Sequence, residues 1–448
     1  MNYVERVVAE LTANYQNEPE YLQATLDWID LVRPVVDAHP EFEKMDLLTR
    51  MVEPDKMYSF RVSWADDQGM AHTNVGYRVQ FNNAIGPYKG GLRFQPQVNA
   101  SVVKFLGFEQ TYKNAMTGLP IGGGAGGANF DPRGKSEREI MRFCQAFMTA
   151  LYRHIGADTD VPAGDIGVGQ REIGYLYGQY KRLTSRAERG VLTGKGTTYG
   201  GSLIRQKAAG YGAVYFLEKM LEQNGTTIED KTIIASGFGN MTWGVCRKVS
   251  KLGGKVVTIS GPDGYVYDPD GVVGKEKLDY LIAMRQSGAD KVEPYAEKFG
   301  VKFYPNQRPW GVVADIAMPC ATQNELDVAD AQALINNDVA YYVEGANMPA
   351  TRQAMAMLRG CKTMLCASSK SAGCGGVAVS ALEMAQNSVR YEWSDKEVNQ
   401  HLKRVMGEIF DSALNAAKRY DLGSDLVAGA NIAAFEKIAG TMMAEGLF

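Results

Sequence analysis

The chain has 448 residues, too many for one ordinary domain and enough for two domains that each bury a core. Its 45% hydrophobic and 22% charged residues are ordinary for a globular protein, and the net charge of −3 gives no reason to expect nucleic acid as a partner. No apolar run could span a bilayer and the first residues lack a leader pattern, so we expect a cytoplasmic protein with no membrane partner.

The first half of the chain mixes helical and strand patterns. Apolar residues recur at helical spacing in residues 4–11 and 137–152, which predicts two amphipathic helices. Residues 57–62 and 73–81 alternate apolar and polar side chains, as half-buried strands do. The pattern lapses in a Gly/Thr-rich stretch at residues 194–201, where we place a domain boundary.

The second half has a βα pattern. In chain order we expect a helix at 208–223, a strand at 231–236, a glycine turn at 237–244 with a helix after it, strands at 255–260, 313–318, 340–344 and 363–366, and a long helix at 397–420. The first of these elements form a βαβ unit of the length that dinucleotide-binding folds use.

The turn of this βαβ unit carries Gly237 and Gly239 between a strand and a helix. That context suits a dinucleotide, because the backbone must approach the pyrophosphate and the helix N-terminus supplies partial positive charge. Thr242 stands where a third small residue is usual. Asp263, after the second strand, could accept hydrogen bonds from a ribose, and the alternative is a plain turn residue in GPDG (261–264).

Two glycine-rich segments stand out. LPIGGGAGG (119–127) looks like a catalytic loop without a titratable side chain, and a second glycine-rich turn, at 161–169, carries the single carboxylate Asp165. Nearby, Lys89 is expected on a tight turn, and Gln110 and Lys113 lie three apart on a probable helix face. Convergent ammonium groups suit a small dianionic substrate, whereas the alternative for any one lysine is a solvated surface charge.

The six cysteines and four histidines are scattered without a repeated short spacing. This pattern predicts neither a disulfide framework nor a zinc cluster, so we expect reduced, mostly buried thiols and no metal. Metal catalysis and histidine-based nucleophilic catalysis both lose support.

Several long segments resemble the hexameric glutamate dehydrogenases, and the similarity runs nearly end to end. They are YRVQF (77–81), residues 86–94, KFLGFEQ (104–110), DVPAGD (160–165), PCATQN (319–324), EGANMP (344–349) and EMAQN (383–387). The resemblance implies an α/β subunit with an N-terminal substrate-binding and oligomerisation domain (1–200, with 423–448 returning to it), a C-terminal Rossmann-type domain (201–422) and a cleft between them. It also implies a homohexamer.

The activity implied is NAD(P)-linked interconversion of L-glutamate with 2-oxoglutarate and ammonia. By resemblance, Lys89 and Ser380 would hold the side-chain carboxylate with Arg205 nearby, Gln110 and Lys113 the α-carboxylate, Gly164 would contact the amino group, and Asp165 would shuttle protons. The expected cofactor-binding residues are Gly237, Phe238, Gly239, Asn240, Met241, Asp263, Ala321, Thr322 and Asn347. We expect NAD, with NADP as the alternative, because Asp263 has no neighbouring arginine to pair with a 2′-phosphate.

The chain departs from this family where the chemistry should be. Ala125 stands where family members carry a catalytic lysine of depressed pKa that activates water and polarises the developing oxyanion. Further departures are Ala128, Asn129, Ala209, residues 206–207 and the segment 368–376, which includes Gly373.

Two main interpretations follow. The protein is an amino-acid dehydrogenase of weakened rate or altered substrate, with Asp165 and a relocated base such as Lys195 or Lys370 handling protons. Alternatively, it is a non-catalytic paralogue that binds dinucleotide and dicarboxylate as a sensor or regulatory partner. A third possibility is that Ala125 and Gly373 together make room for a bulkier substrate or another nucleophile.

Overall fold

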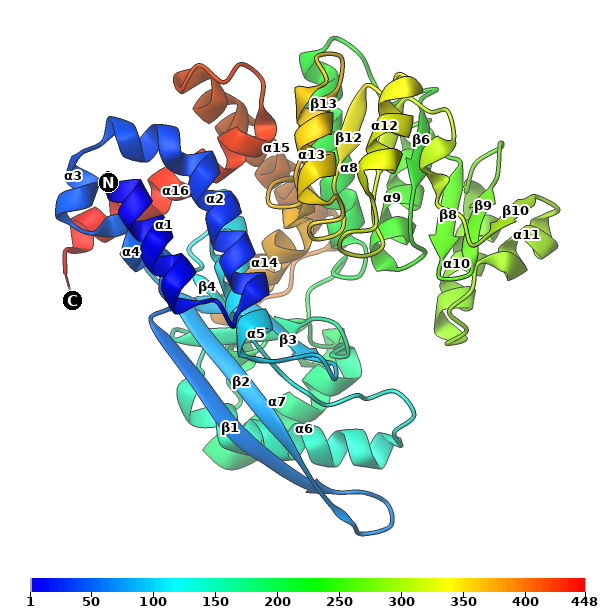
Figure 1. Ribbon diagram of the computed structural model, residues 1–448. Coiled ribbons are helices and arrows are strands. Elements are labelled where there is room, and N and C mark those ends of the chain that lie inside the picture. Colours follow the sequence, from blue (N-terminus) through cyan, green and yellow to red (C-terminus); the bar gives the residue numbers. More distant parts are fainter. Residues whose placement is uncertain (1, 448) are drawn as a thin grey trace. The chain divides into compact units, whose positions relative to one another are not determined.

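The computed structural model describes residues 2–447; residues 1 and 448, the outer ends of the expected first domain, lie outside the described range. The chain forms two compact α/β units (Figure 1). One contains the chain up to Leu203, Ala378–Val398 and the stretch from Asn431; the other contains Ile204–Val377 and Asn399–Ala430. The expected α/β fold class is confirmed.

The first unit is built on a five-stranded sheet of order β1-β2-β4-β3-β5. Its strands are β1 (Lys56–Ala65), β2 (Ala71–Asn82), β3 (Tyr88–Phe94), β4 (Gly123–Ala128) and β5 (Asp160–Gly164). β1, β2 and β4 pair antiparallel, and β3 runs parallel to both β4 and β5. The alternating pattern therefore predicted β1 and β2 correctly, and they form the long hairpin in Figure 1.

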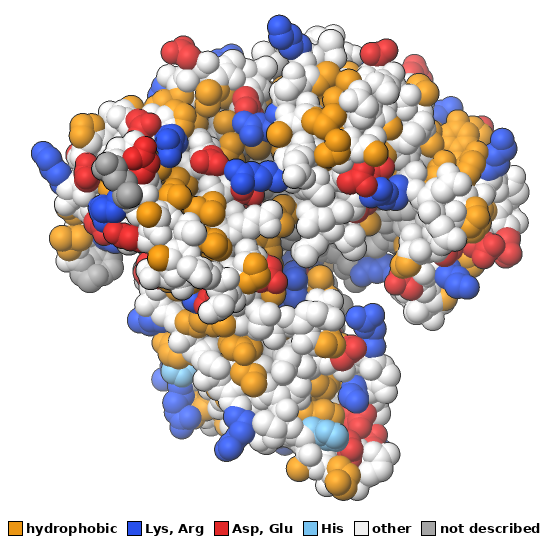
Figure 2. Space-filling model, in the orientation of Figure 1, with side chains coloured by type: hydrophobic (Ala, Val, Ile, Leu, Met, Phe, Trp, Pro, Cys, Tyr) orange, Lys and Arg blue, Asp and Glu red, His pale blue; other side chains and the backbone are white. Residues whose placement is uncertain are grey.

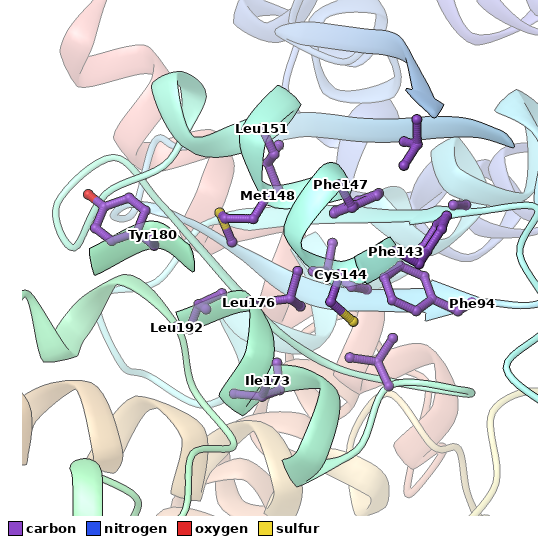
Figure 3. Close-up of a cluster of buried hydrophobic side chains, with 14 of the residues drawn as sticks. Phe94, Phe143, Cys144, Phe147, Met148, Leu151, Ile173, Leu176, Tyr180 and Leu192 are labelled. Carbon is purple, nitrogen blue, oxygen red and sulfur yellow. The ribbon is translucent and has the colours of Figure 1, made fainter. Parts of the chain in front are cut away.

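A hydrophobic cluster fills the space between this sheet and the helices α6 (Glu137–Leu151) and α7 (Gln170–Thr184). α6 begins with a capping box between Ser136 and Glu139, and its residues at helical spacing, among them Phe143 and Phe147, point into the cluster (Figure 3). The remaining helices of this region are α1 (Tyr3–Asn14), α2 (Pro19–Ala38), α3 (Glu41–Lys44), α4 (Leu47–Val52) and α5 (Ala100–Met116). Aromatic contacts of Trp28 with Phe108 and Phe435 join α2, α5 and the C-terminal helix.

Only residues 119–122 of the stretch expected as a catalytic loop lie outside regular structure, and residues 123–127 belong to a buried central strand, β4. Its glycines are crowded by the backbone of the neighbouring strands, by α5 and by Arg78 of β2. The Arg78 side chain pairs with Asp160 on β5, across β4 and β3, with Nε 2.8 Å from Oδ2. A Cβ at Gly126 would lie 3.1 Å from Arg78 Cδ. The expected tight turn around Lys89 is likewise a strand, β3, and the expected turn at 161–169 begins as β5.

The second unit contains a parallel sheet of order β13-β12-β11-β6-β7. Its strands are β6 (Thr232–Ala235), β7 (Lys255–Val256), β11 (Ile316–Met318), β12 (Tyr341–Val343) and β13 (Leu365–Ala367). Its helices are α8 (Ala208–Gln223), α9 (Asn240–Lys251), α10 (Gly274–Gln286), α11 (Glu293–Phe299), α12 (Val328–Asn336) and α13 (Arg352–Gly360). The helix predicted at 208–223 is confirmed to the residue.

One strand expectation is wrong in part. The strand predicted at 255–260 divides after β7, because the chain leaves the parallel sheet at Val257 and continues as β8 (Thr258–Gly261). β8 joins β9 (Gly264–Tyr267) and β10 (Lys302–Pro305) in a separate three-stranded antiparallel sheet. The strands expected at 313–318, 340–344 and 363–366 exist but are each three residues long.

The last helices are α14 (Gly375–Val389), α15 (Asp395–Arg419) and α16 (Leu426–Glu445), and the limits of the two units fall within them. All six cysteines are free and all but Cys361 are buried, which confirms the expectation for the thiols. Acidic and basic side chains are interspersed on the face shown in Figure 2. Between residues 2 and 447, no helix is both long and apolar enough to cross a membrane.

Candidate functional site

Lys89 and Ser380, expected to hold one carboxylate, are brought together through a residue that the sequence did not point to. Lys89 Nζ donates to Thr193 Oγ1 at 2.8 Å, and Thr193 Oγ1 lies 2.5 Å from Ser380 Oγ. All three side chains are buried. They come from β3, from the segment before the Gly/Thr-rich stretch and from α14, all within the first unit. One ammonium and two adjacent hydroxyls are a donor set that suits a carboxylate.

Gln110 and Lys113 lie on α5, less than one helical turn apart. Gln110 Nε2 donates to Asn114 Oδ1 at 2.6 Å, and Asn114 Nδ2 donates in turn to the carbonyl of Lys89 at 3.0 Å. Gln110 also lies against Gly90, where a Cβ would be 3.3 Å from its Cγ. The α5 amides are therefore tied to the strand that carries Lys89.

Asp165 directly follows β5, and its side chain lies over Gly91 of β3, where a Cβ would be 2.8 Å from Asp165 Cβ. Its carboxylate Oδ2 accepts from Arg93 Nε at 2.8 Å. The sequence did not identify Arg93 as a partner of this carboxylate. The preceding residue, Gly164, is also crowded, since a Cβ there would lie 2.4 Å from the carbonyl oxygen of Val168.

Ala125 lies inside β4, opposite Val79 of β2, and is 2% exposed. The strand lies close under α5, because a Cβ at Gly123 would be 1.8 Å from Thr111 Oγ1. The methyl group of Ala125 can neither donate a proton nor accept one.

Lys195, one candidate for a relocated base, forms a buried ion pair with Glu383 of α14, with Nζ 2.7 Å from Oε1 and both side chains fully buried. The other Glu383 oxygen accepts from the backbone N–H of Gly194 at 3.1 Å. Burial lowers the pKa of Lys195, and the adjacent carboxylate opposes that change. The ammonium is thus engaged in holding the loop that carries Thr193, which argues against its use as a relocated base.

In the second unit, the expected cofactor residues gather at the carboxyl ends of the parallel strands. Gly237 follows β6 with φ +75°, and a Cβ there would lie 3.1 Å from the carbonyl oxygen of Cys320. Gly239 caps α9, which begins with Asn240 and Met241, and a Cβ there would have open space within 4 Å. A glycine cradle beside a helix N-terminus is the geometry that a pyrophosphate requires.

The close packing usually provided by a third small residue of this motif is found elsewhere. Thr242 is buried and its hydroxyl donates to the carbonyl of Ser236 at 2.9 Å, so the larger side chain is accommodated. Gly210 of α8 and Gly244 of α9 make the close contact instead, since a Cβ at Gly244 would lie 3.0 Å from Gly210 Cα.

Asp263 has the contacts of a capping carboxylate. Its oxygens accept from the backbone N–H groups of Val292 and Glu293 at 3.0 Å, at the start of α11. The ring of Phe238 lies on the same corner, with Cε1 3.4 Å from the Cβ position of Gly261. The turn interpretation of Asp263 therefore has structural support, and its contact with a ribose remains a prediction.

Ala321 and Thr322 follow β11, and their backbone N–H groups donate to Glu325 Oε1 at 3.0 and 3.3 Å. Asn347 follows β12 and is exposed. The two loops are tied by the N–H of Asn324, which donates to the carbonyl of Met348 at 2.9 Å. Glu325 was not anticipated from the sequence.

Arg205, expected near the substrate carboxylate, belongs to the second unit, where its Nη1 lies 3.4 Å from the Cβ position of Gly376. Lys370, the other candidate base, lies in a buried serine-rich segment and its carbonyl accepts from the thiol of Cys374 at 2.9 Å. Among the described residues there is no group of three or more His, Cys, Asp or Glu side chains placed to hold a metal ion.

Two family models match the chain. Residues 200–446 match the one described as Glutamate/Leucine/Phenylalanine/Valine dehydrogenase, and residues 54–182 match the one described as Glu/Leu/Phe/Val dehydrogenase, dimerisation domain.

Individual proteins are similar over nearly the whole chain. The NAD-specific glutamate dehydrogenase of Clostridium symbiosum is 55% identical, and the NADP-specific glutamate dehydrogenase of Psychrobacter sp. (strain TAD1) is 47% identical, each over 99% of both chains. A solved glutamate dehydrogenase, 55% identical, superimposes with a TM-score of 0.99 over 100% of both chains. The Plasmodium falciparum glutamate dehydrogenase, 44% identical, gives a TM-score of 0.96 over 100% of this chain and 95% of its own.

Proposed function

Since this chain belongs to the Glu/Leu/Phe/Val dehydrogenase family, we propose that it is an NAD-linked amino-acid dehydrogenase of the glutamate type with an altered proton-handling site. The reaction converts L-glutamate, water and NAD⁺ into 2-oxoglutarate, ammonium, NADH and a proton. The observation that carries the proposal is the buried Lys89–Thr193–Ser380 cluster, which retains a carboxylate-binding donor set.

Dinucleotide binding is supported by the second unit. Gly237, Gly239 and the N-terminus of α9 leave room for a pyrophosphate at the end of β6, and Phe238, Asn240, Met241, Asp263, Ala321, Thr322 and Asn347 are the further residues proposed to contact the cofactor. We propose NAD, because the negative charge of Asp263 disfavours a 2′-phosphate; NADP is the alternative, as its use by some named relatives suggests.

We propose that substrate is held at both ends by side chains of the first unit, with one charge contributed by the second unit. Lys89 and Ser380 would bind the side-chain carboxylate, with Arg205 contributing charge, and Gln110 and Lys113 would bind the α-carboxylate. Holding a substrate at two carboxylates leaves its Cα in one orientation, which is the positional part of catalysis.

Bound nicotinamide would accept a hydride from the substrate Cα, or return it. Around this step, Asp165 would transfer protons to and from the substrate nitrogen, with the Gly164 carbonyl orienting the amino group. Arg93, paired with Asp165 in the structure, fixes the position of that carboxylate. Ala125 supplies no general acid or base, and the loss of such a group costs about 10²- to 10⁴-fold in rate. We therefore expect weak turnover of glutamate, or turnover of another substrate.

One alternative is that the protein is a non-catalytic paralogue that binds dinucleotide and dicarboxylate as a sensor or regulatory partner. The buried methyl group at position 125 and the engagement of Lys195 by Glu383 favour this alternative.

A turnover assay separates the two. The purified protein would be incubated with NADH, ammonium and 2-oxoglutarate, then with a panel of other oxo acids and amines, and NADH absorbance followed. Turnover of any member supports the dehydrogenase. No turnover, together with saturable NADH and 2-oxoglutarate binding in calorimetry, supports the sensor, and absence of binding contradicts both.

We also propose that residues 1–200, with 423–448, form the substrate-binding and oligomerisation domain, that 201–422 form the nucleotide-binding domain, and that the subunits form a homohexamer. Within 201–422, the stretch Ala378–Val398, which carries Ser380, belongs to the first compact unit. The match of residues 54–182 to a dimerisation domain supports an oligomeric role for the first of these.

A further inference from the structure

Glu325 occupies an unusual place in the second unit, because its carboxylate joins two loops that are both proposed to contact the cofactor. Oε1 accepts from the backbone N–H groups of Ala321 and Thr322. The carboxylate also hydrogen-bonds the hydroxyl of Ser236, the residue immediately before Gly237. Ser236 Oγ in turn accepts from the N–H of Cys320 at 2.8 Å.

We infer that Glu325 is a positioning residue for the dinucleotide: as a carboxylate it holds residues 320–322 against the end of β6, and as a neutral acid it releases them. This inference rests on the proposed dinucleotide site. It goes beyond that proposal because it makes cofactor affinity depend on the protonation of a side chain that need not touch the cofactor.

The ionised form of Glu325 should hold the loop more firmly than the neutral form. An ionised carboxylate accepts hydrogen bonds at both oxygens, and bonds from backbone N–H groups to an ionised acceptor are stronger than neutral ones. A neutral carboxyl group must place a proton on one oxygen and so loses acceptor capacity toward two N–H groups and a hydroxyl. The loop 320–322 has no other described acceptor for the N–H groups of Ala321 and Thr322.

Arg308, Cys320 and Tyr342 supply charged or titratable groups near Glu325. Arg308 donates from Nη1 to the Glu325 carbonyl at 3.0 Å, while its guanidinium pairs with Asp327 and Asp330. Burial raises the pKa of the Cys320 thiol and of the Tyr342 phenol, and the nearby charge of Glu325 adds to both increases, after that of Glu344 in the case of Tyr342. Burial raises the pKa of Glu325, and its hydrogen bonds and the charge of Arg308 oppose that increase.

Cofactor affinity should weaken at low pH. If cofactor binds best to the loop held by the carboxylate, the pKa of Glu325 is lower in the bound protein than in the free protein. Affinity is then constant at pH values above the free-state pKa and weakens as pH falls through it, by up to about tenfold per pH unit for one proton.

The test uses Glu325→Gln, Glu325→Leu and the exposed control Glu297→Gln, with NADH titrated by fluorescence from pH 8 to pH 5. Glutamine is neutral and has one acceptor oxygen, like the protonated acid, so its affinity at pH 8 should fall to the level that wild type reaches at low pH and should then stay flat down to pH 5. Leucine removes the acceptor, so its affinity should be about tenfold weaker throughout. Glu297→Gln should keep the wild-type slope. A Glu325→Gln protein with the wild-type slope would overturn the inference.

A second measurement does not require cofactor. Hydrogen exchange of the peptide covering residues 319–325 should be about tenfold faster at Ala321 and Thr322 in Glu325→Leu than in wild type or Glu297→Gln. Unchanged exchange would show that Glu325 does not hold the loop and would overturn the inference. Changed exchange in a protein that shows no saturable NADH binding would instead contradict the proposed dinucleotide site.

Discussion

Position 125 carries a methyl group on a buried strand that otherwise consists of glycine and alanine, so this strand has no side chain that can transfer a proton. Ala125→Lys should raise glutamate turnover by about 10²- to 10⁴-fold if the rest of the proposed site is intact, because it supplies a general acid and base. NADH absorbance measures the change. Ala125→Met adds similar bulk without an amine and should stay at the wild-type rate. Equal rates for lysine and methionine would show that the other substitutions have remodelled the site.

The hydroxyl of Thr193 connects Lys89 and Ser380, so its removal should lower the affinity for a bound carboxylate. Thr193→Val preserves the shape of the side chain and should weaken 2-oxoglutarate binding by about tenfold, the loss expected for a hydrogen bond near a charge. Calorimetry measures the affinity. Thr149→Val, on the exposed side of α6, is the matched control and should bind as wild type. Unchanged affinity in Thr193→Val would place the carboxylate elsewhere.

At the scale of single residues, the sequence pointed to Lys89 and Asp165 because they lie in long distinctive segments, and to Ser380 through the family resemblance. It missed Thr193, Arg93 and Glu325. Each of these acts through a partner that is remote in the chain or on another loop, and no local spacing marks it. The contacts that position a side chain are a property of the folded chain, so a motif alone does not reveal them.

At the scale of elements, β4 is the clearest case of glycine required by packing. Gly126→Val introduces a residue of high strand propensity, yet its Cβ would meet Tyr77 O at 2.7 Å and Leu92 Cδ2 at 2.8 Å. We expect a loss of about 1–3 kcal/mol or more in the free energy of unfolding, measured by urea denaturation. Gly178→Ala in α7, where a Cβ meets nothing within 4 Å, should instead stabilise by about 0.5–1 kcal/mol. A stable Gly126→Val protein would contradict the packing explanation.

The ion pair of Lys195 and Glu383 anchors the loop of Thr193 to α14. Glu383→Gln removes one charge of a fully buried pair and should cost about 3–5 kcal/mol of unfolding free energy. Equilibrium denaturation measures this, with the exposed Glu392→Gln in the same segment as control. A cost below about 1 kcal/mol would mean that the pair is solvated in solution.

The elements predicted best are those whose signal is local. Helices α6, α8 and α15 show apolar residues at helical spacing and agree with the structure within two residues at each end. The wrong expectations concern β3 and β4, where glycines suggested a turn and a loop, and the strand at 255–260. The glycines are explained by close contact with the backbone of neighbouring strands, with Arg78 and with α5. The division at Val257 is explained by pairing of β8 with β9, which lies later in the chain. Both causes are tertiary.

At the scale of the whole molecule, the proposed homohexamer has a mass of about 294 kDa, six times the 49.0 kDa subunit. Light scattering after size-exclusion chromatography should give this mass. The mass should not change on dilution, because a homo-oligomer of this kind is expected to have closed point-group symmetry. A species of 49.0 kDa would contradict the proposal. An intermediate mass would show that the protein forms an oligomer smaller than a hexamer.

The buried pair of Arg78 and Asp160 has a wider consequence. Because β4 is packed tightly by neighbouring strands, by α5 and by this arginine, the sheet requires the glycines whether or not the strand carries a reactive amine. A descendant that has stopped turning over substrate would still display the hallmark sequence. The glycine-rich sequence therefore indicates the family to which such a chain belongs. Its present activity has to be inferred from the individual side chains of the site.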